Sequence, residues 1–221
     1  MNIMITAIFA ALPFYLLALP IILLNMLLIS KKRKLLNIGF ELKEKIAILG
    51  FILSIIFVLG ITIGNNNSAS LENVRLGSIN IIPLKGMKVQ YLFALKGYMY
   101  FIINLFGNVL IFIPLGFFLS IYYKDDAKER FKIIITSMII SFFIEFLQLF
   151  IGRASDINDI ILNTIGAWLG RLIFLYFNII FENFFNTINL RCINISNNKG
   201  VKRIRILQLF LWIIFLVFNL M

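Results

Sequence analysis

The chain contains no histidine and only one cysteine, Cys192, among its 221 residues. Mechanisms that use an imidazole base, a histidine nucleophile or histidine-ligated zinc are therefore excluded, and with them many membrane hydrolases and phosphatases. A single cysteine also excludes a disulfide framework within the chain. Charged residues are scarce, at 14%, whereas soluble proteins carry roughly a quarter. These shortages argue against a soluble domain.

Hydrophobic residues make up 61% of the chain and gather in long runs. Such runs are long enough for helices that cross a hydrocarbon layer of about 30 Å at about 1.5 Å per residue. We therefore expect an all-α, polytopic transmembrane helical bundle with five to six spanning helices. The runs cover residues 4–29, 46–63, 98–123, 133–151, 157–180 and 206–221, and the last is either a short span or an interfacial helix.

Basic residues divide the chain and predict its orientation. We expect an N-terminal transmembrane helix with a basic cytoplasmic loop (1–45), a central transmembrane domain (46–180), and a basic tail with a C-terminal hydrophobic helix (181–221). With the N-terminus outside, the inner segments hold fifteen basic residues and the outer ones five. This matches the positive-inside tendency for a multi-pass protein of the cell membrane. The net charge of +11 then serves orientation and contact with anionic membrane lipids, and no nucleic acid partner is expected.

Polar side chains interrupt three of the runs at a similar depth. Charged or strongly polar residues inside a span are costly, so their default interpretation is a functional site. In the predicted orientation all of them lie in the outer half of the membrane, and we expect a ligand-binding site that opens outward. Its candidate residues are Asn104, Asn108, Glu145, Gln148, Arg153, Asp156, Asp159 and Asn163.

Structural roles compete with that interpretation. Ser137 and Ser141, on the same helix face as Glu145, favour hydrogen bonds between helices, and Asp156 is placed to cap the following helix. For Glu145 a structural pairing and a functional role stay open. Carboxylate and amide oxygens at this spacing could hold Mg²⁺ or Ca²⁺. The spacing is no specific metal signature, however, so we expect neither a metal nor a cofactor.

Four further expectations concern packing and charge. Gly166 and Gly170 form a small-xxx-small pattern, which predicts a close helix contact. Arg171, near the inner surface, is expected to extend to the cytoplasmic headgroups. The apolar patch at residues 79–83 should dip into the outer interface and cover the polar cluster. Arg153 should lie over the mouth of the site, paired with Asp156 or Asp159, because buried carboxylates need a cation or a proton.

Several short segments, taken in order, resemble the VanZ-like family of bacterial membrane proteins. The likeness covers about residues 47 to 177, although Leu84 stands where the family usually has phenylalanine and Ser155 where a bulkier residue is expected. The segments are NIIPL at 80–84, GNVLIFIPLG at 107–116, EFLQ at 145–148, GR at 152–153 and DINDIILNTIG at 156–166.

This resemblance implies an association with resistance to teicoplanin-type glycopeptide antibiotics, but it implies no agreed biochemical activity. The preferred interpretation is a non-catalytic protein that binds an amphipathic ligand from the outer leaflet, such as a lipoglycopeptide acyl chain or a lipid-linked precursor of the envelope. The alternative is an intramembrane enzyme acting on a lipid or peptidoglycan precursor. Glu145 would then be the acid or base, assisted by Asp159. A proton-coupled transporter is a third class, without an internal repeat to support it.

Overall fold

The computed structural model describes most of the central part of the chain. The described residues are 22–23, 26–27, 29–31, 33–34, 37, 39, 41–63, 79–85, 99–124, 126–150, 153–186 and 188. Within them, four helices are long and apolar enough to cross a membrane. This confirms the helical membrane bundle and is compatible with five to six spans. The predicted run 4–29 lies largely, and the run 206–221 entirely, outside the described residues.

The helices follow the hydrophobic runs closely, except that those of the second and fourth runs each begin four residues earlier, at Leu42 and Glu129. Sequence reasoning assigned both charged stretches to loops. Glu44 and Glu129, however, each make an ion pair with an arginine, which lets the helix begin among charged residues. The helices are α2 (Leu42–Thr62), α4 (Met99–Tyr123), α5 (Glu129–Phe150), α6 (Ile157–Ile180) and the short α7 (Glu182–Asn186), with two-residue strands β1 (Ile79–Asn80) and β2 (Ser155–Asp156).

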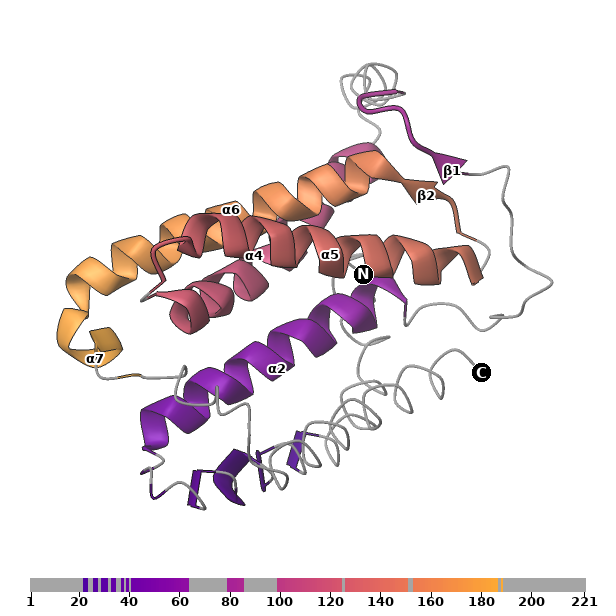
Figure 1. The fold of residues 1–221 in the computed structure, drawn as a ribbon. Helices are drawn as coiled ribbons and strands as arrows, with labels where there is room; N and C mark the ends of the chain where they lie inside the picture. The colour runs from indigo at the N-terminus through magenta and orange to yellow at the C-terminus, as the bar shows by residue number, and fades with distance from the viewer. Residues whose placement is uncertain are drawn as a thin grey trace. The chain divides into compact units, whose positions relative to one another are not determined.

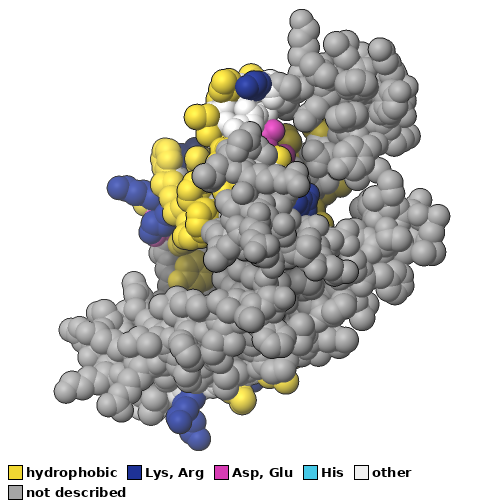
Figure 2. Space-filling view, turned by 90° about the vertical axis from the view of Figure 1, so that its right-hand side faces the viewer, with side chains coloured by type: hydrophobic (Ala, Val, Ile, Leu, Met, Phe, Trp, Pro, Cys, Tyr) yellow, Lys and Arg dark blue, Asp and Glu magenta, His cyan; other side chains and the backbone are white. Residues whose placement is uncertain are grey.

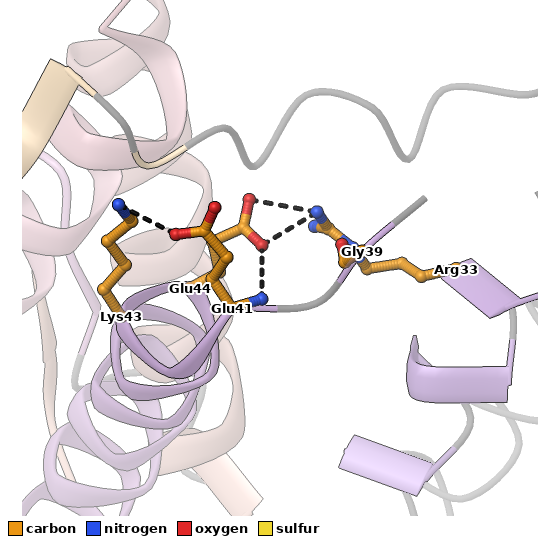
Figure 3. A network of polar contacts seen from close by, with 5 residues as sticks. All are labelled: Arg33, Gly39, Glu41, Lys43 and Glu44. Atoms are coloured by element: carbon orange, nitrogen blue, oxygen red, sulfur yellow. Dashed lines mark hydrogen bonds and ion pairs between the residues drawn. The ribbon is translucent and has the colours of Figure 1, made fainter. Parts of the chain in front are cut away.

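The chain forms two compact units, one of residues Met1–Asn65 with Ile180–Met221 and the other of Asn66–Ile179. In the first unit, polar contacts define where α2 begins (Figure 3). The Glu44 carboxylate accepts a hydrogen bond from the backbone N–H of Glu41, 3.1 Å away, which satisfies a donor that the helix leaves free. The same carboxylate pairs with the guanidinium of Arg33 at 2.8 Å, and both side chains are buried. A buried pair of this kind fixes the chain that precedes α2.

In the second unit, α4 and α6 pack against each other through glycines (Figure 1). A β-carbon placed on Gly166 would lie 2.1 Å from the carbonyl oxygen of Val109, and one on Gly170 would lie 2.1 Å from that of Ile113. Contacts this short show that the two backbones touch, which confirms the predicted close helix contact. Because both positions advance by four residues together, α4 and α6 run in the same direction.

Helix α5 runs opposite to α6 and turns its polar stripe inward. Ser137, Ser141, Glu145 and Gln148 are all buried, and the Asn163 amide of α6 donates to the Ser141 hydroxyl at 2.8 Å. The other faces of α5 and α6 expose large apolar side chains, as expected for helices that contact lipid. Hydrophobic side chains also make up most of the described part of the surface seen in Figure 2.

A short parallel strand pair closes one end of this unit. Strand β1 pairs with β2, so that Ile79 lies opposite Ser155 and Asn80 opposite Asp156. Strand β2 leads directly into α6, and β1 belongs to the segment between α2 and α4 (Figure 1). The predicted apolar patch at residues 79–83 is therefore placed against the connection between α5 and α6, while residues 64–78 and 86–98 lie outside the described residues.

Candidate functional site

The connection between α5 and α6 is held by the carboxyl group of Glu145. This side chain is only 3% exposed, and its Oε2 accepts the backbone N–H of Asp156 at 2.9 Å. The Ser155 side chain also hydrogen-bonds to the same carboxyl group. Because Glu145 lies about one and a half turns before the end of α5, these contacts fold the connection back over the helix end. The small Ser155, a departure from the family pattern, thus has a polar role here.

Asp156 caps α6, as predicted. Its Oδ1 accepts the backbone N–H of Asn158 at 2.9 Å, which satisfies one of the free donors at the helix start. The same oxygen accepts the side-chain amide of Asn80 at 2.8 Å. One carboxylate therefore joins the start of α6 to strand β1.

Asp159 lies one turn further along α6 and contacts α4. Its Oδ1 accepts the side-chain amide of Asn108 at 2.6 Å. An amide that donates to a carboxylate makes a charge-assisted hydrogen bond, which is stronger than a neutral one. Asn108 and Asp159 therefore link α4 and α6 at the same end of the bundle at which Glu145 links α5 to the hinge. The sequence-based expectation that three helices bring polar side chains together at one level holds for these residues.

The remaining candidates are placed around this layer. Asn163 and Gln148 are buried, and Asn163 bonds to Ser141 deeper in the bundle, not to the carboxylates. Asn104 lies in α4, and its side chain is outside the described part of the structure. Among the predicted site residues, Glu145, Asp156 and Asp159 thus form the centre, together with Asn108.

Arg153 lies at the rim of this centre. Its backbone N–H donates to the carbonyl of Gln148 at 3.1 Å, and its side chain is exposed. The positive charge of Arg153 favours the ionised form of the carboxyl groups of both Glu145 and Asp159. The negative charge of Asp159 disfavours the ionised form of Glu145. A direct ion pair of Arg153 with Asp156 or Asp159 stays a prediction.

Sequence reasoning missed two residues that build the site, Asn80 and Asn158. Asn158 is 4% exposed. Its Oδ1 accepts the backbone N–H of Leu84 at 2.7 Å, and its Nδ2 donates to the carbonyl of Lys85 at 3.2 Å. The i, i+3, i+7 spacing that selected Asp156, Asp159 and Asn163 passes over position 158. The available signals were an asparagine in the first turn of an apolar helix, for Asn158, and the place of both residues in the segments that carry the family resemblance.

The expectation for Arg171 is wrong. Its guanidinium donates to both oxygens of Glu129, at 3.1 Å each, and lies over the ring of Trp168 at 5.0 Å. The side chains of Arg171 and Glu129 are only 11% and 14% exposed. Pairing with a carboxylate across the bundle satisfies the guanidinium better than extension to the headgroups, and the sequence search had assigned Glu129 to a loop. This pair lies at the opposite end of α5 and α6 from the candidate site.

The polar layer can hold charge, and each of its three carboxyl groups has at least one oxygen that already accepts a hydrogen bond. Within the described ranges, no group of three or more His, Cys, Asp or Glu residues has an arrangement suited to a metal ion. Two carboxylates held by amides, beside an exposed guanidinium, are instead suited to the recognition of a polar headgroup.

Of the comparisons with known proteins, the one with protein families found a match. No curated protein and no solved structure matches the chain. The family model described as VanZ/LLP1 matches residues 46–182, which include most of α2, all of α4, α5 and α6, and the whole candidate site. Since this match covers more than half of the 221 residues, the chain belongs to the VanZ/LLP1 family.

Proposed function

We propose that this protein binds an amphipathic ligand of the cell envelope at the end of the bundle that carries the polar layer. The ligand is a lipid-linked precursor or a lipoglycopeptide such as teicoplanin, whose headgroup offers phosphate or carboxylate. The observation that carries the proposal is the fixed polar layer of Asn108, Glu145 and Asp159, with the exposed Arg153 close enough for its charge to act on both carboxyl groups. A guanidinium binds phosphate and carboxylate through paired hydrogen bonds.

The surroundings of the layer support an amphipathic ligand over a small polar one. Phe142, Phe143 and Phe146 on α5 and Ile161 on α6 are exposed within about two turns of the carboxylates. An acyl chain can lie along these side chains while its headgroup reaches Arg153. The proposal includes a cell-membrane location with the N-terminus outside, so that the ligand arrives from the outer leaflet. Labelling of engineered cysteines at positions 82 and 128 with a membrane-impermeant thiol reagent, in intact cells without Cys192, tests this orientation.

Binding to the full-length chain in lipid nanodiscs tests the function. Arg153→Ala should weaken binding of a lipid-linked precursor or of teicoplanin by about tenfold, because one charge-assisted contact contributes roughly 1.5–3 kcal/mol. Arg130→Ala is the matched control, since Arg130 is also exposed but lies at the other end of α5. Unchanged affinity in Arg153→Ala would remove Arg153 from the mechanism.

The enzyme hypothesis makes a different prediction for Glu145. The side chain accepts a backbone hydrogen bond in a nearly closed environment, which favours a positioning role over proton transfer to a ligand. Glutamine can accept the same hydrogen bond but cannot act as an acid or base. A binding protein with Glu145→Gln should therefore keep most of its affinity and cellular phenotype. Loss of turnover of a lipid precursor with unchanged binding would favour the intramembrane enzyme.

A further inference from the structure

Residues 79–85, which we name the 79–85 turn, present apolar side chains outward beside the polar layer. Ile79, Ile81, Ile82 and Leu84 are 40%, 73%, 54% and 65% exposed. The turn ends with the exposed Lys85. At the upper end of the described surface in Figure 2, hydrophobic side chains lie beside a basic one. Four large aliphatic side chains in seven residues are unusual for a turn that faces water.

The backbone of this turn is fixed by side chains at the start of α6. Leu84 has a positive φ of 63°, a strained conformation for a residue other than glycine. Its N–H donates to Asn158, which also donates to the carbonyl of Lys85. Asn80 accepts the N–H of Ile82 at 3.3 Å and donates to Asp156. The strained turn is thus held from two sides.

The contact with Asn158 ties the turn to the start of α6. Asn158 is the second residue of α6 (Ile157–Ile180), a helix long and apolar enough to cross a membrane. A turn held at the end of such a helix lies near the membrane surface when the helix spans the bilayer. Exposed aliphatic side chains at that surface gain free energy by leaving water for the acyl chains. The amine of Lys85 is then placed to contact anionic headgroups.

We infer that the 79–85 turn is a lipid-inserted anchor, with its aliphatic side chains in the outer-leaflet interface, and that Asn158 is the residue that positions it. The partner is the bilayer itself. The anchor ties the 79–85 turn to the hinge that carries Asp156, so lipid contact holds this turn in place beside the polar layer. This inference does not depend on the identity of the ligand.

Spin labelling of the full-length chain tests the insertion. A nitroxide is attached at Ile82→Cys in a Cys192→Ser background, in vesicles of phosphatidylethanolamine and phosphatidylglycerol. Its collision rates with oxygen, which concentrates in lipid, and with a water-soluble nickel chelate are compared. Lys128→Cys is the control, since Lys128 is exposed in the polar connection between α4 and α5. We expect the oxygen-to-nickel ratio at position 82 to exceed the control several-fold.

Two outcomes would overturn the anchor. A ratio equal to that at position 128 would place the tip in water. Low collision rates with both reagents would show that protein covers it. Labels at these exposed positions replace no buried side chain, so folding should be retained.

The role of Asn158 has its own measurement. In Asn158→Ala the spectrum of the label at position 82 should become more mobile and its oxygen-to-nickel ratio should fall, because both hydrogen bonds to the turn are lost. Asn158→Asp keeps the acceptor for Leu84 but loses the donor to Lys85, so its effect should be smaller, and it supplies the result if the alanine variant does not fold. An unchanged spectrum in a folded variant would contradict the positioning role.

Discussion

Glu145 accepts a hydrogen bond from the backbone N–H of Asp156, across a connection that joins two membrane-spanning helices. The bond links a buried carboxyl group in α5 to the residue that caps α6. Asp156 in turn bonds to Asn80 of strand β1. Two acidic side chains therefore join α5, the start of α6 and the strand β1, which is distant in the sequence, and the geometry of the candidate site depends on both.

The first prediction separates the shape of Glu145 from its charge. Glu145→Leu should lower the free energy of unfolding by about 1–3 kcal/mol, because it leaves the N–H of Asp156 without its acceptor. Glu145→Gln should lower it less, since the amide oxygen can still accept. Unfolding by SDS in mixed micelles measures both. Phe143→Leu, an exposed change on the same helix, is the control. An equal loss for the Leu and Gln variants would mean that the charge, and not the hydrogen bond, stabilises the hinge.

The second prediction concerns the contact between α4 and α6. Gly166→Ala would bring a β-carbon to 2.1 Å from the carbonyl oxygen of Val109. The helices must move apart, and we expect a loss of about 1–3 kcal/mol, typical of overpacking. The control is Gly107→Ala in α4, where no atom lies within 4 Å of the added carbon. That change should be neutral or stabilising by up to about 1 kcal/mol, because alanine favours a helix. Similar melting temperatures for the two variants in detergent would contradict the close contact.

The fold was predictable from the sequence to the extent that hydrophobic runs determine it. The runs at 46–63, 98–123 and 157–180 match α2, α4 and α6 within a few residues, because backbone groups in hydrocarbon must bond within a helix. The contact at Gly166 was also predictable, since small residues four apart permit close approach. The start of α5 was missed because Glu129 is charged, and its partner Arg171 is 42 residues away.

The sequence predicted most of the residues that form the site, but not which of them bond to each other. Costly polar residues in spans identified Glu145 and Asp159, and helix periodicity placed them at one end. The structure pairs Asn108 with Asp159 and not with Glu145. The choice depends on how α4 is rotated against α6, which no local pattern contains. The contacts of Asn80 and Asn158 depend on the pairing of β1 with β2, and strands of two residues leave no periodic signal.

The third prediction addresses the ion pair between Glu129 and Arg171. Arg171→Leu should destabilise the protein by roughly 1.5–3 kcal/mol, the range for hydrogen bonds to charged groups. Arg171→Lys should recover only part of this, because an ammonium lacks the paired geometry. The double variant Glu129→Arg with Arg171→Glu, which exchanges the two residues, should be more stable than either single charge reversal, Glu129→Arg or Arg171→Glu. Failure of the exchange to improve on the single reversals in SDS unfolding would show that the charges do not act as a pair.

A more exposed pair provides the comparison for that experiment. Lys132 pairs with Asp126 in the connection before α5, and the Lys132 side chain is 44% exposed. Solvent screens such a pair, so Lys132→Leu should change the stability by less than about 1 kcal/mol. An effect as large as that of Arg171→Leu would indicate that burial is not what distinguishes the two pairs.

The last prediction concerns Arg153 and the two carboxyl groups on which its charge acts, Glu145 and Asp159. If Arg153 lies over the mouth of the site, removal of its charge by Arg153→Gln should destabilise the protein, and removal of a facing carboxylate by Asp159→Asn should offset part of that loss. Because Arg153 is exposed, the coupling energy should be modest, between about 0.5 and 1 kcal/mol. A double-mutant cycle of the free energy of unfolding measures it, and Arg130→Gln with Asp159→Asn is the control cycle. Strict additivity of Arg153→Gln and Asp159→Asn would mean that the guanidinium turns toward lipid headgroups, which is the ordinary position of a single basic residue at a helix end.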